Sequence, residues 1–268
     1  MDHVVGCFVY FFDESSVWGI GLGIVFGAVW LASYWPPLFK RPWLWAVLVS
    51  SAFLTMAAVY FIQNPLVNSI YKEQILSWLW SHGVLGRLVS LAGVPLFMGL
   101  IQEGAKLLPV VFWWRRSGRN LDPKLGLVIG AVAGAGFAIL EAHLALNYVF
   151  NYGLSGMVSL WMQFGIVNGF WGIFFTVAAQ TAFSAMAGYG LARGRGWQFY
   201  LIASALHGLL YMALTIFPGF TYFVYGNPTA SLGASIYTAV LAALVTGWAL
   251  WLRWRRTTGI AEPDVSSS

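Results

Sequence analysis

Hydrophobic residues fall into long, nearly unbroken runs along this chain, and short polar connections separate the runs. Stretches close to the roughly 20 residues that cross a bilayer as a helix occur seven times, at residues 17–35, 43–62, 88–114, 125–150, 172–192, 197–217 and 233–252. Apolar runs of this length are typical of transmembrane helices. We therefore predict an all-α, multi-pass membrane helical bundle with about seven transmembrane helices.

Two further segments are too polar or too interrupted to count as spans. Residues 64–87 combine apolar positions with charged side chains and tryptophans, which favours a helix that lies in the membrane interface. Residues 156–171 are apolar but contain glutamine, asparagine and glycine, so they either extend the fifth helix or form a short re-entrant piece. The polar tail at residues 257–268 is predicted to be disordered, which leaves residues 1–256 as a single transmembrane domain.

Basic residues fall in alternate connections between the predicted spans. Eleven of the 14 follow the first, third, fifth or seventh run, namely Lys40, Arg41, Arg115, Arg116, Arg119, Lys124, Arg193, Arg195, Arg253, Arg255 and Arg256. Lysine and arginine are enriched in cytoplasmic loops of membrane proteins. We therefore predict an N-terminus outside, a C-terminus in the cytoplasm and a location in the plasma membrane.

The composition supports this interpretation and excludes several classes of protein. With 59% hydrophobic and 9% charged residues, the chain has too little polar surface for a soluble protein of 268 residues. The net charge of +5 would favour nucleic-acid binding in a soluble protein, but here the basic residues lie in the connections, so we predict no nucleic-acid partner. The single cysteine, Cys7, excludes an intrachain disulfide and a thiolate metal cluster.

Three charged side chains lie deep inside the predicted spans: Glu103, Lys106 and Glu141. An ionised group at mid-bilayer costs about 2.5–3.5 kcal/mol on insertion scales, so such groups usually have a function. Glu103 and Lys106 are three residues apart and share a helix face, so they can pair. Pro109 removes a backbone hydrogen bond and is expected to kink the helix beside this pair.

Two other spans place polar side chains near the same depth. Measured from the cytoplasmic end at about 1.5 Å per residue, Glu103 lies about 16 Å deep, His207 about 15 Å, Gln180 about 18 Å and Glu141 about 24 Å. We therefore expect these groups to converge. A structural interpretation stays open, because a buried Glu–Lys pair can pin helices together and a glutamine can hydrogen-bond between them. His143 is two residues from Glu141 and points to another face, so it is not counted among the site residues.

The order of these residues resembles that of a known family. The segments Gln102-Glu103-Gly104-Ala105-Lys106 and Gly136-Phe137-Ala138-Ile139-Leu140-Glu141, followed by His207, resemble the PrsW-like glutamic intramembrane proteases. The wider group includes CAAX-processing and bacteriocin-processing enzymes and the APH-1 subunit of gamma-secretase. The resemblance covers residues 93–211 and implies that a glutamate activates water to cleave peptide bonds in or near the membrane. On that pattern Glu103 matches the second glutamate of a Glu-Glu-x-x-Lys motif, Lys106 its lysine, Glu141 the downstream glutamate and His207 the last histidine.

Three positions depart from the family pattern. Gln102 replaces the first glutamate, Gln180 aligns with an expected histidine, and Tyr211 stands where an acidic residue often follows the last histidine. An amide cannot act as a general base near neutral pH, so one acid/base group is missing. The APH-1 branch also has a Gln-Glu sequence and serves as a scaffold. We therefore predict an intramembrane protease, with a catalytically inactive scaffold that holds a protein partner as the alternative, and a proton-coupled transporter after that.

For an enzyme, we expect Glu103, kept ionised by Lys106, to take a proton from water while His207 or Gln180 donates to the carbonyl oxygen. Glu141 would orient the water or return a proton to the leaving amine. The expected partners are the bilayer and a membrane-protein or lipid-embedded peptide substrate. We predict no cofactor. A zinc-dependent version would need Glu103, Glu141 and His207 as three ligands, although the chain lacks the His-Glu-x-x-His spacing of many zinc proteases.

Overall fold

The structure is a computed structural model of the whole chain, and it describes residues 16–70, 81–88, 92–148, 150, 160–216 and 228–255. The described residues form helices and no strand, which confirms the all-α prediction. In chain order the elements are α2 (Val17–Ala32), α3 (Trp43–Ala58), the π-helical turn η1 (Val59–Gln63), α4 (Asn64–Ile70), α6 (Gly83–Leu88), α7 (Val94–Arg116), α8 (Pro123–Tyr148), α9 (Leu160–Ala192), α10 (Gly196–Ile216) and α11 (Pro228–Trp254). Each predicted apolar run coincides with one of the long helices.

Several of these helices have the dimensions of membrane spans. Within the described residues, five are long and apolar enough to cross a bilayer: Trp43–Ser69, Val94–Arg116, Pro123–Asn147, Gly169–Ala192 and Leu232–Trp254. The shorter helix Val17–Ala32 is also apolar. Large apolar side chains on their outer faces are exposed, such as Trp18 at 73% and Leu244 at 68%. Such exposure suits contact with lipid, so the chain is a multi-pass membrane protein.

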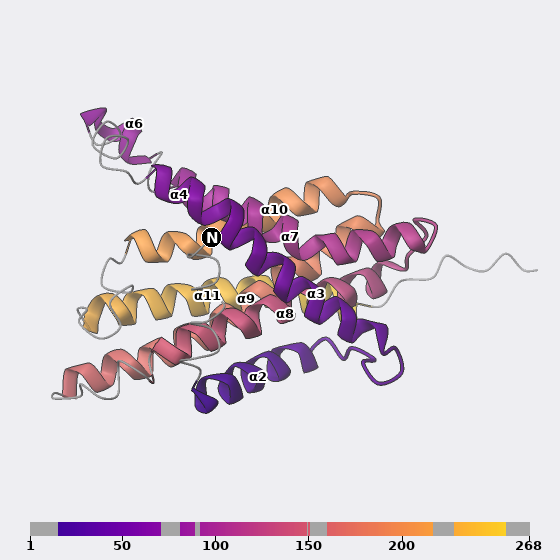
Figure 1. Cartoon of the computed structure of the whole chain (residues 1–268), viewed down its shortest axis with the longest axis horizontal. Helices are drawn as coiled ribbons and strands as arrows, with labels where there is room; N and C mark the ends of the chain where they lie inside the picture. The colour runs from indigo at the N-terminus through magenta and orange to yellow at the C-terminus, as the bar shows by residue number, and fades with distance from the viewer. Residues whose placement is uncertain are drawn as a thin grey trace, which may run out of the picture.

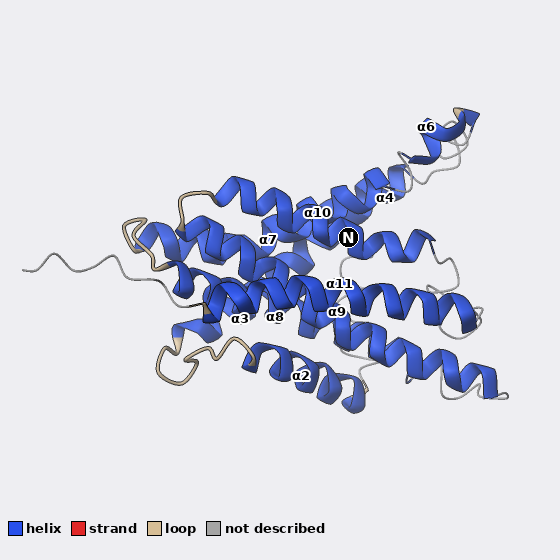
Figure 2. Cartoon of the chain, turned by 180° about the vertical axis from the view of Figure 1, so that it is seen from behind, coloured by secondary structure: helices blue, strands red, loops and turns tan. Residues whose placement is uncertain are grey.

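Helices α8 and α9 form the centre of the bundle, and the other long helices pack around them (Figure 1). Helices α2 and α3 pack on α8, α11 packs on α9, and α10 packs on α7 and α9. The view from behind shows the same arrangement, with α2 along one side of the bundle (Figure 2). The chain therefore brings α7, α8, α9 and α10, which carry the candidate site residues, into one bundle.

Glycines allow two pairs of helices to approach at backbone distance. A Cβ atom on Gly134 of α8 would lie 2.6 Å from the carbonyl oxygen of Gln180 in α9. A Cβ atom on Gly208 of α10 would lie 2.8 Å from the Cα atom of Leu96 in α7. Small residues at such positions are the usual means of close helix packing in membranes. The two contacts set the separation of the helices that carry Gln180 and His207.

Two irregular segments of the sequence take a clear form in the structure. The helix of the second predicted span continues beyond residue 62 through η1 and α4, so residues 64–70 do not lie apart from that span as predicted. The π-helical turn explains the continuation, because Asn64 N–H bonds to the Val59 carbonyl and shifts the register just before Pro65, which has no N–H to donate. Residues 71–80 lie outside the described residues.

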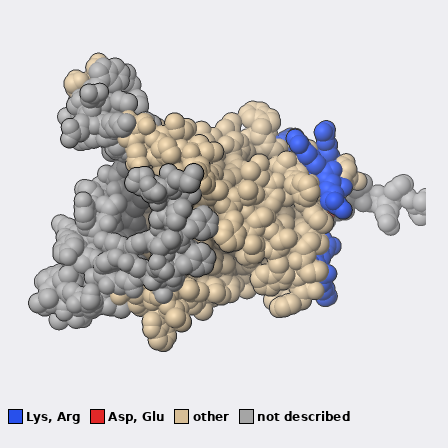
Figure 3. All heavy atoms as spheres, viewed as in Figure 1, with Lys and Arg blue, Asp and Glu red and all other residues tan. Residues whose placement is uncertain are grey.

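Residues 160–171 extend the fifth span outward as the first part of α9, which is one of the two predicted alternatives. Helix α7 runs without interruption through Pro109 to Arg116. On the face that Figure 3 shows, the visible Lys and Arg side chains of the described residues gather at one end of the molecule, opposite to the end where α4 and α6 lie. This is the arrangement that the alternation of basic connections predicted. Cys7 and the tail at residues 257–268 lie outside the described residues.

Candidate active site

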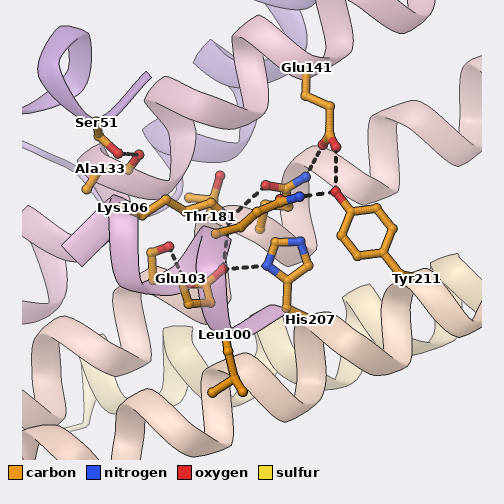
Figure 4. A network of polar contacts seen from close by, with 12 residues as sticks. Ser51, Leu100, Glu103, Lys106, Ala133, Glu141, Thr181, His207 and Tyr211 are labelled. Atoms are coloured by element: carbon orange, nitrogen blue, oxygen red, sulfur yellow. Dashed lines mark hydrogen bonds and ion pairs between the residues drawn. The ribbon is translucent and has the colours of Figure 1, made fainter. Parts of the chain in front are cut away.

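The centre of the site is the carboxylate of Glu103, which lies in the middle of α7 and is completely buried. Its Oε1 atom accepts hydrogen bonds from Lys106 Nζ and from His207 Nδ1, each at 2.7 Å. Its Oε2 atom accepts a hydrogen bond from Ser184 Oγ at 2.9 Å. Figure 4 shows the side chains of Lys106 and His207 turned toward this carboxylate. Glu103 therefore joins α7 to α9 and α10.

Lys106 balances the charge of Glu103 and extends the network toward a second carboxylate. Its ammonium is fully buried, donates a further hydrogen bond to Gln180 Oε1 at 2.8 Å and lies 5.2 Å from the centroid of the Phe137 ring. The amide nitrogen of Gln180 donates in turn to Glu141 Oε2. A buried charge is stable only with partners of this kind. Lys106 and Gln180 thus connect the two glutamates.

Glu141 lies on the partly exposed side of the network. Its Oε1 atom is 2.8 Å from the hydroxyl of Tyr211, which is also 3.0 Å from Gln102 Oε1. The Gln102 amide nitrogen donates to Gln63 Oε1 at 2.9 Å. Glu141 and Tyr211 are partly exposed, whereas Gln63 and Gln102 are buried. The network therefore lies nearest to the molecular surface at Glu141 and Tyr211.

All six side chains that the sequence singled out belong to this one network, namely Gln102, Glu103, Lys106, Glu141, Gln180 and His207. The three positions that depart from the family pattern lie next to one another around Glu141, because Gln180 and Tyr211 bond to it and Gln102 bonds to Tyr211. The substitutions at these positions therefore form one connected set of hydrogen bonds.

Sequence reasoning missed two members of the network. Gln63 lies at the end of a predicted span, where polar residues are common, and the π-helical turn that directs it to Gln102 has no obvious sequence signal. Ser184 is one helical turn from Gln180 and therefore shares its face, which was the available signal. Tyr211 was noticed only as a departure from the family pattern, and its bond to Glu141 gives it a place in the site.

His207 has one ring nitrogen in use and one without a partner. Because an ionised carboxylate only accepts hydrogen bonds, the contact with Glu103 assigns the proton to Nδ1. The Nε2 atom is buried and has no hydrogen-bond partner. In Figure 4 it points away from Glu103, toward the side of the network where Glu141 and Tyr211 lie. The ring of Tyr211 stacks on the imidazole, with centroids 5.0 Å apart. Nε2 therefore has an unused capacity to accept one hydrogen bond.

The acidic and imidazole groups do not converge as metal ligands. In the part of the chain that the structure describes, no group of three or more His, Cys, Asp and Glu side chains could hold a metal ion. Glu103 and Glu141 are connected through Lys106 and Gln180 rather than directly, so an ammonium already neutralises the position between them. The donors in this arrangement do not fit the three-ligand zinc site of Glu103, Glu141 and His207.

His143 has a separate environment, as its position on another face of α8 predicted. Its Nε2 atom lies 3.0 Å from the side-chain nitrogen of Asn147, and Asn147 Oδ1 accepts a hydrogen bond from the backbone of Ser16 at 3.0 Å. These contacts hold the start of α2 against α8. His143 thus provides a comparison for His207, since both are buried histidines and His207 bonds to Glu103 whereas His143 bonds to Asn147.

The sequence model of the PrsW family intramembrane metalloproteases matches residues 39–251. No curated protein and no solved structure matches the chain significantly. The matched segment includes every residue of the network, from Gln63 to Tyr211. Because it also covers most of the chain, the protein belongs to the PrsW family of intramembrane proteases.

Proposed function

We propose that this protein hydrolyses peptide bonds of membrane-associated proteins, using a water molecule that a glutamate of the network activates. One observation carries the proposal: two glutamates, a lysine, a glutamine and a histidine from four helices form a continuous hydrogen-bonded network inside a membrane bundle, and one of the glutamates, Glu141, is partly exposed. We also propose that all seven long helices span the membrane, with the N-terminus outside and the C-terminus in the cytoplasm.

Glu141 is better placed than Glu103 to act as the base. The two oxygens of Glu103 already accept hydrogen bonds from an ammonium, an imidazole and a hydroxyl, and the side chain is fully buried. Glu141 contacts two neutral groups and is partly exposed. A general base must be within reach of the water that it deprotonates. We therefore assign the base to Glu141 and the electrostatic support to Glu103, in place of the base role that the sequence suggested for Glu103.

The remaining groups support the same reaction. A water beside Glu141 donates one hydrogen to that carboxylate and the other to the free Nε2 of His207, which leaves its lone pairs directed at the scissile carbonyl. As Glu141 takes the proton, the Tyr211 hydroxyl is released from it and donates to the developing oxyanion. Glu141 then returns the proton to the leaving amine. Lys106 and Glu103 hold His207 and Gln180 in place through their hydrogen bonds.

The family's description makes a metal possible for a member of the family. We propose that the chemistry uses the chain's own acid, imidazole and hydroxyl groups, because Glu103, Glu141 and His207 do not converge on one point. Incubation with a zinc chelator should therefore leave the cleavage rate within about twofold of the untreated protein. Loss of activity on chelation, with recovery on adding zinc, would contradict this part of the proposal alone.

The test uses the full chain in liposomes with membrane-anchored peptide substrates. Glu141→Gln is expected to lower the cleavage rate at least about a hundredfold, since general acid–base groups contribute about 10²–10⁴. His143→Gln, on the same helix but outside the network, should keep the wild-type rate. Cleavage that Glu141→Gln leaves unchanged would exclude Glu141 as the base.

A non-catalytic scaffold is the second candidate, and Gln102 favours it because an amide stands where the family pattern has an acid. The network would then pin five helices together for a partner protein. This function predicts a stable partner on co-purification, no cleavage by wild-type protein and no effect of Glu141→Gln on that partner. Isolation of a monomer that cleaves peptides would exclude it.

A further inference from the structure

A second polar cluster lies away from the active site, where α9 and α11 end. Tyr189 is 5% exposed, and its hydroxyl oxygen accepts hydrogen bonds from Arg193 Nη1 at 3.4 Å and from Arg255 Nη2. Both guanidinium groups also lie over the tyrosine ring, with their Cζ atoms 5.9 Å and 5.6 Å from its centroid. Two cations from different helices therefore converge on one phenol.

No carboxylate neutralises these two cations in the part of the chain that the structure describes. The two ion pairs found there both involve Glu103, which belongs to the active site. Like charges at short range repel, and the partial burial of Arg255 limits screening by water at that residue, whereas Arg193 is exposed. Each guanidinium has five N–H donors, and Tyr189 accepts only one from each. The cluster therefore has donors and positive charge available for an anion.

The cluster lies at the level of the lipid headgroups. Arg193 directly follows the candidate span Gly169–Ala192, and Arg255 directly follows Leu232–Trp254. Beside them, Trp251 and Trp254 are 57% and 58% exposed, as is typical of aromatic residues at a membrane boundary. Figure 3 shows that basic side chains gather at this end of the molecule. A phosphate at this height would belong to the surrounding leaflet.

We propose that Arg193, Arg255 and Tyr189 form a binding site for the phosphate group of an anionic phospholipid. Planar guanidinium groups bind phosphate oxygens in pairs, and the exposed side chains of Trp251 and Trp254 beside them offer apolar surface to the acyl chains. Arg255 lies beyond the segment that matches the family, so the site joins the family domain to the residue that follows α11. A lipid bound there would hold the ends of α9 and α11 together.

The test counts lipids bound to the purified full chain. The protein in detergent is mixed with equal amounts of phosphatidylglycerol and phosphatidylcholine, and native mass spectrometry measures the retained adducts. We expect selective retention of phosphatidylglycerol and a decrease of about fivefold for each arginine removed in Arg193→Gln and Arg255→Gln, alone and combined. The control Arg115→Gln/Arg116→Gln removes the same charge from the end of α7 and should keep the adduct. The single variant Arg255→Gln is not expected to disturb the fold, because Arg255 follows the last packed helix, so a loss of adduct in this variant cannot be attributed to misfolding.

Three results would overturn the proposal. An equal loss of the lipid adduct in the Arg115→Gln/Arg116→Gln control would mean that binding depends only on the general positive charge at this end of the molecule. Full competition by inorganic phosphate at millimolar concentration would make the site one for a soluble anion instead of a lipid. Selective retention that appears only after Glu262→Gln/Asp264→Asn would identify the acidic tail of the chain as the natural occupant. None of these measurements depends on proteolysis, so they do not depend on the proposed function.

Discussion

His207 reaches across from α10 to α7 and donates its Nδ1 hydrogen to Glu103 at 2.7 Å, while its buried Nε2 atom has no partner. A carboxylate in this position fixes the tautomer and orientation of an imidazole and stabilises any positive charge that develops on it. The relationship separates two roles. In the mechanism that we propose, Glu103 is a positioning residue and Nε2 is the part of the pair that contacts water.

The separation of roles can be tested with His207→Asn. The shorter amide can replace Nδ1 as the donor to Glu103, but it has no atom at the position of Nε2. We expect the variant to fold like the wild type and to lose activity about a hundredfold, as for other acid–base groups. Thermal unfolding in detergent and cleavage in liposomes provide the two readouts.

The matched control is His143→Asn, which removes a buried imidazole that lies outside the network. It should retain the wild-type cleavage rate. If His207→Asn also retained that rate, Nε2 would have no part in the reaction, and the hydrogen bond to Glu103 would be purely structural.

Lys106→Met tests how far Glu103 depends on its counterion. The variant leaves a fully buried carboxylate without the ammonium at 2.7 Å, and breaking a buried ion pair in this way costs about 3–5 kcal/mol of unfolding free energy. The double variant Glu103→Gln/Lys106→Met removes both charges and should recover a substantial part of that loss. Unfolding by denaturing detergent measures the loss of unfolding free energy in both variants. The control is Lys40→Met, which changes an exposed lysine and should leave the unfolding free energy almost unchanged.

A double variant as unstable as Lys106→Met alone would show that the loss comes from packing. The lysine stem, and not its charge, would then be the main contribution of Lys106 to stability. This outcome would leave the hydrogen bond to Gln180 as the main polar role of the residue.

The sequence predicted the helices well because apolar length and the spacing of basic connections are both local signals. The main error lay at Asn64 and Pro65, which normally mark a helix end but here follow a π-helical turn. The shared depth of Glu103, Glu141 and His207 also predicted that they belong to one network. Depth cannot show how each helix is rotated, so the different exposure of the two glutamates, on which our proposed assignment of the base rests, could not be predicted.

Tyr211→Phe tests the hydroxyl that stands where an acid often occurs in the family. It removes the hydrogen bond to Glu141 and the donor that we assign to the oxyanion. Loss of one oxyanion donor costs about 10²–10³ in kcat, and we expect a decrease near the lower end with KM little changed. Tyr237→Phe removes a hydroxyl that bonds to the Leu209 carbonyl outside the network and should not alter kcat. A change confined to KM would instead place Tyr211 in substrate binding.

Gly134→Ala tests whether the close approach of α8 and α9 sets the geometry of the site. The added Cβ atom would lie 2.6 Å from the Gln180 carbonyl oxygen and 2.9 Å from the Thr181 Cα atom, and both are backbone atoms that cannot turn aside. We expect a loss of about 1–3 kcal/mol of unfolding free energy from overpacking, together with lower activity, because Gln180 and Glu141 lie on the two separated helices.

Gly247→Ala is the matched control, since nothing lies within 4 Å of its Cβ position. It should stabilise α11 by up to about 1 kcal/mol through helix propensity. Equal stability and activity of both variants would mean that α8 shifts freely against α9, and the separation of Glu141 from Gln180 would then not depend on this glycine.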